Sequence, residues 1–202
     1  MLARRARGFS LIELLIAIGI LAVVVSMGLP SFNTFIANSR LRATTELFYT
    51  GLQQARSAAV QNNTQVQFVF TTDDFDAGVN PNTTNLATVA SGAISYIVRY
   101  ADPAVPGNYI LVSSKSYLEG SGKSVGGVPP VVVNNGGVST ITFTPLGATT
   151  LGSSATVAFT NPTGGTCAAA GPMRCLNVVV SVGGQVKMCD PAVTAAGDTR
   201  KC

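Results

Sequence analysis

GFSLIELLIAIGILAVVVSMGL, residues 8–29, is an apolar run that contains one charged side chain, Glu13. As a helix, its 21 residues from 9 to 29 would be roughly 30 Å long, about the thickness of the hydrocarbon core of a bilayer. Three arginines and no acidic residue lie within residues 4–7 just before it. Because cytoplasmic flanks carry an excess of basic residues, this pattern predicts a single membrane span with a cytoplasmic N-terminus.

The carboxylate of Glu13 is expensive inside lipid, so it needs a partner or a role. No cation lies within the apolar run to neutralise it. An ordinary secretory signal, cut near Ala22 or Ser26 and discarded, is the alternative interpretation. A charge in the middle of the apolar region argues against that alternative.

Residues 8–15, GFSLIELL, resemble the class III signal of type IV pilins and type II secretion pseudopilins. The resemblance implies that a membrane-bound prepilin peptidase cuts between Gly8 and Phe9 and that the new N-terminus of Phe9 is methylated. Residues 1–8 would then be a leader peptide. It also implies that Glu13 pairs with the Phe9 amine of a neighbouring subunit during assembly, so that other major and minor pilins are partners through this helix.

Composition narrows the functional classes. The chain has 202 residues, of which 47% are hydrophobic and only 11% charged, as suits burial in a membrane or an assembly. Loss of the three leader arginines from the 13 basic residues leaves 10 against 9 acidic residues, so the net charge falls from +4 to +1. No general affinity for polyanions follows. Histidine is absent, which removes the commonest general base and metal ligand.

Four cysteines lie in the last fifth of the chain, on the outward side of the predicted span: Cys167, Cys175, Cys189 and Cys202. An even number there predicts two disulfides in an oxidising compartment. Zinc is disfavoured, because the spacings contain no CxxC pair. Three connectivities are possible, and the short loops with glycine or proline favour Cys167–Cys175 and Cys189–Cys202.

A second helical half follows the span. Pro30 should kink the helix, and residues 31–63 are amphipathic. An apolar stripe recurs at spacings of 4, 3, 4, 3 and 4 residues along it: Leu41, Thr45, Phe48, Leu52, Ala55 and Ala59. We therefore predict one long kinked helix over residues 9–62, with residues 9–30 in the membrane or filament core.

From residue 64 the pattern alternates with period two and predicts strands. Residues 73–92 are expected to form a loop and residues 120–127 a flexible glycine-rich tract. Strands are predicted at 64–70, 93–100, 109–113 and 155–160, with hairpins joining 131–133 to 140–144 across 134–137 and 176–182 to 185–189. The fold class is therefore α+β: a long N-terminal helix packed on an antiparallel β domain, residues 64–202.

Three further stretches, 55–66, 141–147 and 177–187, resemble the GspH/FimT branch of pseudopilins and minor pilins, which includes FimU-like subunits. That resemblance implies a low-abundance subunit that primes or caps a type IV pilus at its tip, or a pseudopilin of type II secretion. It also implies a bacterial inner-membrane precursor whose domain reaches the periplasm, the pilus tip or the cell surface.

DNA uptake is the second functional hypothesis. FimT members that bind DNA carry a Gly-Arg-x-Arg pattern at the terminal hairpin, where this chain has Gly-Gln-Val-Lys at 184–187. One bidentate phosphate donor is lost and the other becomes a point charge. A small basic patch remains available for sequence-blind contact with DNA: Arg174, Lys187, Arg200 and Lys201.

No catalytic constellation is present, so we expect no enzyme, no cofactor and no metal. Asp73, Asp74 and Asp76 lie close together, but they lack the glycine and the distal glutamate of an EF-hand loop. A solvated acidic loop is the favoured interpretation. The glycine tracts do not stand between a strand and a helix, as a phosphate-binding loop requires.

Overall fold

A computed structural model describes residues 9–73, 80–82, 92–123, 126, 128–162, 164–165, 167–168 and 171–202. The chain forms two compact units, Met1–Ile36 and Ala37–Cys202, and the first helix, α1 (Leu11–Gln61), belongs to both. Most of the expected loop at 73–92 lies outside the described residues, as do residues 124, 125 and 127 of the expected glycine-rich tract at 120–127.

Helix α1 is continuous over 51 residues, close to the predicted range of 9–62. Every member of the predicted stripe from Leu41 to Ala59 is buried. The helix ends where expected, because Asn63 adopts a positive φ of 47° and the Thr64 amide donates back to the Ala59 carbonyl. The kink at Pro30 stays a prediction.

The first sheet contains four antiparallel strands in the order β3-β2-β1-β5. Phe68 is central to it, since it lies opposite Val98 on one side and Ile141 on the other. The strands are β1 (Val66–Thr71), β2 (Ser95–Ala101), β3 (Tyr109–Lys115) and β5 (Thr140–Phe143). The strands predicted near 64–70, 93–100 and 109–113 are therefore confirmed, within a few residues at each end.

The second sheet is also antiparallel and has the order β4-β6-β7-β8. Its strands are β4 (Val132–Asn134), β6 (Ala155–Thr160), β7 (Leu176–Val180) and β8 (Val186–Cys189). The predicted terminal hairpin is confirmed, with Val178 opposite Met188 and a turn at Gly184, whose φ is 77°. Strand β8 lies at the edge of this sheet.

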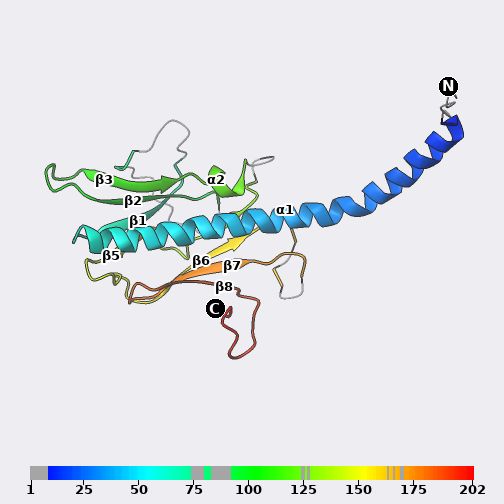
Figure 1. Ribbon diagram of the computed structural model, residues 1–202. Coiled ribbons are helices and arrows are strands. Elements are labelled where there is room, and N and C mark those ends of the chain that lie inside the picture. The colour runs from blue at the N-terminus through cyan, green and yellow to red at the C-terminus, as the bar shows by residue number, and fades with distance from the viewer. Residues whose placement is uncertain are drawn as a thin grey trace, which may run out of the picture. The chain divides into compact units, whose positions relative to one another are not determined.

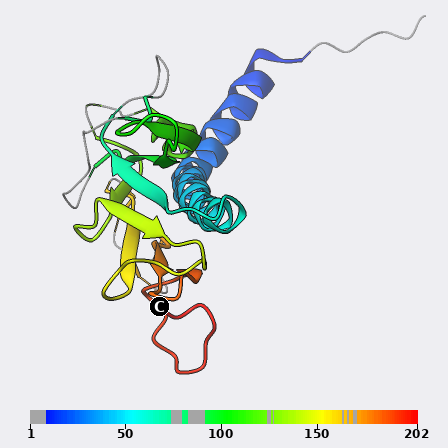
Figure 2. The same cartoon turned by 90° about the vertical axis from the view of Figure 1, so that its left-hand side faces the viewer.

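One aromatic side chain of α1 joins the helix to both sheets. The Phe48 ring centroid lies 5.1 Å from that of Tyr96 in β2 and 5.2 Å from that of Phe159 in β6. Figures 1 and 2 show the C-terminal half of α1 lying along both sheets. Buried residues of the helix and of both sheets form one hydrophobic core. The predicted α+β class, with a long helix packed on antiparallel strands, is confirmed.

The predicted hairpin between 131–133 and 140–144 is wrong. Strand β4 pairs with β6 and β5 pairs with β1, so the turn between them carries the chain from one sheet to the other. The turn residues themselves behave as predicted: Gly136 and Gly137 have positive φ, and the side-chain oxygens of Asn134 and Asn135 accept their amides. The composition of residues 134–137 thus predicted the turn correctly, but it did not predict which strand β5 pairs with.

The start of the predicted glycine-rich tract is also different from the expectation, because residues 118–121 form a short helix, α2 (Leu118–Ser121). It packs closely on α1: a Cβ added to Gly120 would lie 2.7 Å from Leu47 Cδ1. Lys115 Nζ lies 2.6 Å from Glu119 Oε2 and closes the turn from the end of β3. Gly120 therefore provides close packing rather than flexibility.

Candidate functional site

The N-terminal site begins at the edge of the described residues. Gly8 lies outside them, whereas Phe9 is 84% exposed at the start of the helix. The Ser10 hydroxyl oxygen accepts the amide of Ile12 at 3.3 Å, and Glu13 lies in the first turn of α1. A carboxylate there is stabilised by the positive end of the helix dipole.

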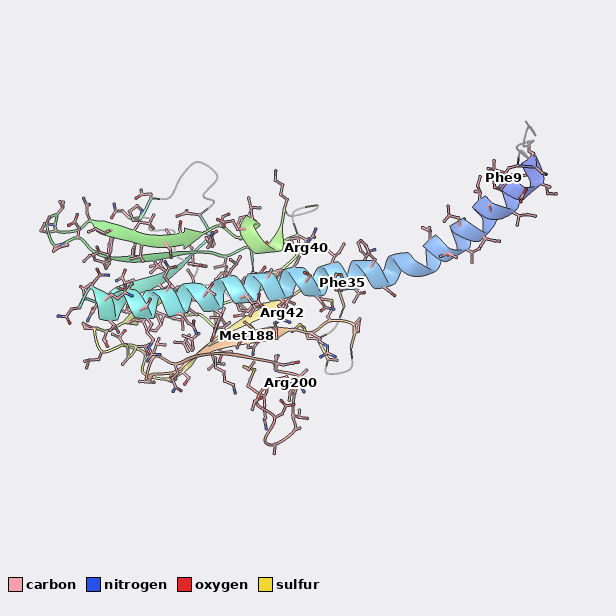
Figure 3. All side chains as sticks on the ribbon, in the orientation of Figure 1. Phe9, Phe35, Arg40, Arg42, Met188 and Arg200 are labelled. Atoms are coloured by element: carbon pink, nitrogen blue, oxygen red, sulfur yellow. A yellow bond between two sulfur atoms is a disulfide. The ribbon has the colours of Figure 1, made fainter. Side chains whose placement is uncertain are left out.

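The helix surface beyond Glu13 is apolar and exposed on every side. Large hydrophobic side chains from Leu11 to Val25 are all exposed, as are Phe32 and Phe35. Figure 3 labels Phe9 and Phe35 on this helix. By length and composition α1 can cross a membrane. Among the described residues, no ion pair involves Glu13. The segment thus presents an apolar surface with one carboxylate.

Both pairs of cysteines favoured by the sequence are disulfide-bonded in the structure. The Cα atoms are 5.4 Å apart in Cys167–Cys175 and 5.0 Å apart in Cys189–Cys202. The second bond joins the end of β8 to the tail of the chain. The tail is thereby folded back onto the terminal hairpin.

Two hydrogen bonds hold the tail beside β8. The amide of Asp190 donates to the carbonyl of Arg200 at 2.7 Å, and the Lys187 ammonium donates to the carbonyl of Lys201, also at 2.7 Å. The structure therefore brings together Lys187, Arg200 and Lys201, three of the four basic residues singled out by the sequence.

Arg200 is neutralised within the tail. Its guanidinium makes a two-point contact with the Asp198 carboxylate, at 3.1 Å from Nε and 2.7 Å from Nη2. The hydrogen bonds from Arg200 lower the pKa of Asp198 to about 2, and the same contact raises the pKa of Arg200. Arg200 is therefore not available as an unpaired cation for a polyanion.

Arg174 is held elsewhere. Its amide donates to the side-chain oxygen of Asn38 in α1, and the Asn38 side-chain amide donates to the carbonyl of Pro172. Among the described residues, no contact links Arg174 to the basic residues of the tail. The four basic residues do not form one patch by any contact that the structure shows.

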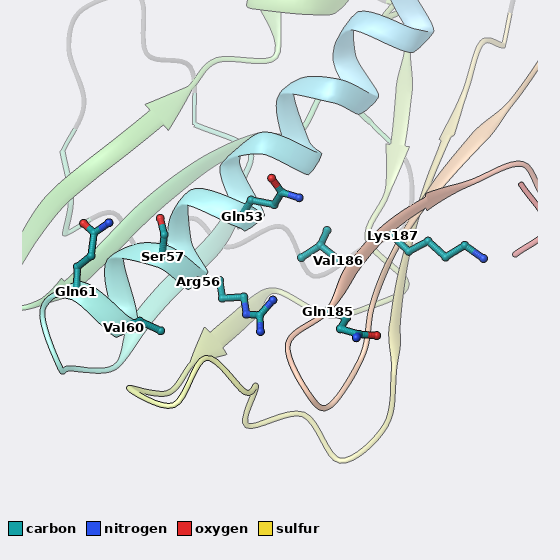
Figure 4. Close-up of a pocket in the computed structure, with 8 residues that line it drawn as sticks. All are labelled: Gln53, Arg56, Ser57, Val60, Gln61, Gln185, Val186 and Lys187. Atoms are coloured by element: carbon teal, nitrogen blue, oxygen red, sulfur yellow. The ribbon is translucent and has the colours of Figure 1, made fainter. Parts of the chain in front are cut away.

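A cavity lies between the C-terminal end of α1 and the β7–β8 hairpin (Figure 4). Its volume is about 760 Å³. It is lined by Gln53, Arg56, Ser57, Val60, Gln61, Gln185, Val186 and Lys187. Its lining thus contains two cations, three glutamines and no acidic residue.

Arg56 is the functional candidate that the sequence did not indicate. Its Nε donates to the carbonyl of Gly147 at 3.0 Å, and Figure 4 shows its guanidinium directed from α1 toward the turn that carries Gln185. Lys187 points away from the helix in the same view. No local signal marks Arg56, since Gly147 is 91 residues away in the sequence.

No group of three metal-ligating side chains is found in the part of the chain that the structure describes. Of the three aspartates considered for calcium, Asp74 and Asp76 lie outside that part.

Comparison with known proteins gives four results. The prokaryotic N-terminal methylation motif matches residues 3–29, while no curated protein matches the chain. Two crystal structures of the type IV minor pilin FimU from Pseudomonas aeruginosa PAO1 are similar at 15% identity; they align over 73% of this chain and 87% or 90% of that chain, with TM-scores of 0.48 and 0.45. The model of the type II transport protein GspH family matches residues 44–184, more than two thirds of the chain, and the chain therefore belongs to that family.

Proposed function

We propose that this chain is a low-abundance subunit of a type IV pilus-like filament, which it primes or caps at the tip. Before assembly, the precursor spans the bacterial inner membrane with its N-terminus in the cytoplasm, and prepilin peptidase removes residues 1–8. The N-terminal methylation motif and the family of the domain support this proposal.

The exposed apolar surface of α1 before residue 26 is the observation that carries the proposal. Such a surface is stable in lipid or against other apolar helices, but not in water. Transfer from lipid to a bundle of neighbouring helices keeps the surface covered and adds helix packing. In that bundle Glu13 meets the amine of Phe9 from the adjacent subunit, because a lone buried carboxylate would be costly.

The experiment replaces Glu13. The Glu13→Ala variant should still be processed, because the cleavage site is unchanged, but it should be absent from filaments sheared from the cell surface. Immunoblots of the membrane and sheared fractions measure this. Glu46→Ala is the matched control, since Glu46 is an exposed carboxylate of α1 paired with Arg42. Normal incorporation of Glu13→Ala would overturn the pairing.

A second candidate function is that of a pseudopilin in type II secretion, which the description of the matched family favours. A strain that lacks the chain separates the two candidates. Loss of surface filaments with normal protein export supports the pilus, and loss of export with normal filaments supports the secretion system.

We do not extend the proposal to DNA uptake. Arg200 is paired with Asp198, and among the described residues no contact joins Arg174 to the basic residues of the tail. Asp190 and Asp198 lie in the same tail. Lys187, Arg200 and Lys201 beside these two aspartates leave a net charge of only +1 (3 − 2), which gives little electrostatic attraction for a phosphate backbone.

A further inference from the structure

The turn at 144–148 is firmly held. The Gly147 amide donates to the Thr144 carbonyl at 2.8 Å, and the Thr144 amide donates to the Ala148 carbonyl at 2.7 Å. Gly147 has a φ of 77°, which favours glycine, and its carbonyl accepts Arg56 Nε from α1. Local hydrogen bonds and a long-range one thus define a single conformation for this turn.

The turn between β7 and β8 packs against the 144–148 turn on the side opposite α1. A Cβ added to Gly184 would lie 1.8 Å from the carbonyl oxygen of Gly147, so the two backbones are in direct contact. Next to this contact, the amide of Thr149 donates to the carbonyl of Val182 at 2.9 Å. The turn is therefore fixed between α1 and the hairpin.

This fixed turn presents a leucine to solvent. Leu146 is 92% exposed, and two further apolar side chains are exposed on the segments that meet the turn: Val60 at 53% and Val182 at 45%. Val60 Cγ2 would lie 3.4 Å from a Cβ added to Gly147. An exposed leucine on an already ordered backbone loses little entropy on binding, which favours a docking role. We name Val60, Leu146 and Val182 the Leu146 surface.

The adjoining cavity indicates the charge of the partner. Arg56 lines the cavity and uses Nε on Gly147, and among the described residues no other acceptor holds its terminal nitrogens. Since no acidic residue lines the cavity, a carboxylate is the complementary group. The partner therefore combines an apolar side chain with a carboxylate.

A second copy of this chain is a less suitable source of that carboxylate, because a low-abundance subunit has mostly other kinds of subunit as its neighbours in a filament. A different subunit fits the surface better.

We propose that the Leu146 surface docks a different subunit of the same filament, through a segment in which an apolar side chain stands beside an aspartate or glutamate. The apolar side chain covers Leu146, and the carboxylate is bound by the free nitrogens of Arg56. This inference rests on the proposed function, because it takes the partner to be a filament subunit.

The test uses the full-length protein in its own cells, with a photo-crosslinking amino acid in place of Val182. Mass spectrometry should identify the crosslinked peptide as part of another filament subunit, with an aspartate or glutamate next to an apolar residue. Leu146→Ser should lower the crosslink yield about tenfold, because it removes an apolar contact. Gln185→Glu should lower the yield by a similar factor, because it adds a carboxylate that repels the carboxylate of the partner. Leu111→Ser, on an exposed leucine of β3, and Gln185→Asn are the matched controls.

Crosslinks to DNA, to lipid or to a second copy of this chain, or an unchanged yield in both variants, would overturn the inference. Its failure is distinguishable from failure of the proposed function. If the protein is present in sheared filaments but does not crosslink to another subunit, the proposed function stands and the docking surface is excluded. If the protein is absent from filaments but still crosslinks to another subunit in the membrane, the docking surface stands and the proposed function is excluded.

Discussion

Gly51 lies in α1 where the ring of Tyr96 crosses the helix. A Cβ at this position would lie 2.5 Å from Tyr96 Cζ. The ring has little freedom to move, because Tyr96 is 3% exposed, its hydroxyl donates to the Leu47 carbonyl, and its centroid is 4.6 Å from that of Phe68. Burial also raises the pKa of this tyrosine.

Gly51→Ala should therefore destabilise the domain. Overpacking costs about 1–3 kcal/mol, and the better helix propensity of alanine returns about 0.5–1 kcal/mol. We expect a lower midpoint of thermal unfolding by circular dichroism of the full chain in detergent. Gly152→Ala, where an added Cβ meets no atom, is the control and should leave the midpoint unchanged. An unaltered midpoint for Gly51→Ala would show that the ring can shift freely.

The Asp198 carboxylate should titrate well below an ordinary aspartate. Its pKa is lowered from 3.8 to about 2 by hydrogen bonds from Arg200. Because the folded-state pKa lies below the unfolded value, the contact stabilises the tail above about pH 4, and this contribution is lost as the pH falls toward 2. Carboxyl-carbon NMR measures the midpoint, which Arg200→Gln should return to near 3.8. An unchanged midpoint in that variant would exclude Arg200 as the cause.

At the scale of elements, the long helix and the terminal β7–β8 hairpin were predictable, whereas the pairing between strands distant in the sequence was not. The stripe from Leu41 to Ala59 repeats a helical period over several turns, so a local pattern determines which face is buried. The turn at 134–137 also carries a clear local signal, yet β5 pairs with β1 across a long sequence separation. Local residues specify the reversal, whereas the core side chains of the whole domain select the partner strand.

The Cys189–Cys202 disulfide provides a test at this scale. Replacing both cysteines with serine should lower the free energy of unfolding by about 3 kcal/mol, as loop closure predicts for a loop of this length. The tail should also open, so the Asp190 amide, which donates to Arg200, should lose protection from hydrogen exchange. Serine at both Cys167 and Cys175 is the control and should leave that amide protected. Retained protection without Cys189–Cys202 would mean that the hydrogen bonds alone hold the tail.

At the scale of the whole molecule, the sequence predicts how the protein enters a membrane better than what its domain binds. The first property depends on a continuous stretch of residues, 8–29, whose spacing and charge can be read in order. The docking surface that we propose depends on Arg56 and on the turn that carries Leu146, two segments that are distant in the sequence and that only the fold brings into contact. Arg56 lies off the apolar stripe, and a charged residue there is equally consistent with simple solvation.

Removal of the leader peptide can be tested on the full-length protein. Gly8→Val should block cleavage, so that mass spectrometry of the membrane protein finds a precursor that still carries residues 1–8 and their three arginines. Gly19→Val changes a glycine in the same apolar run, where an added Cβ meets no atom, and should be cleaved normally. Cleavage of Gly8→Val at the expected position would contradict the assigned site.

The pairing of β1 with β5 also bears on how the domain folds. Val66 and Phe143 are 77 positions apart in the chain yet lie opposite each other, and both are buried in the core shared with α1. Contacts between such distant residues form slowly, since a long loop must close before they give any stabilisation. During that time the apolar part of α1 would keep the unfolded chain tethered to the bilayer, at high local concentration and held at one end. If membrane insertion precedes domain folding, the tether limits the encounters between unfolded chains that lead to aggregation.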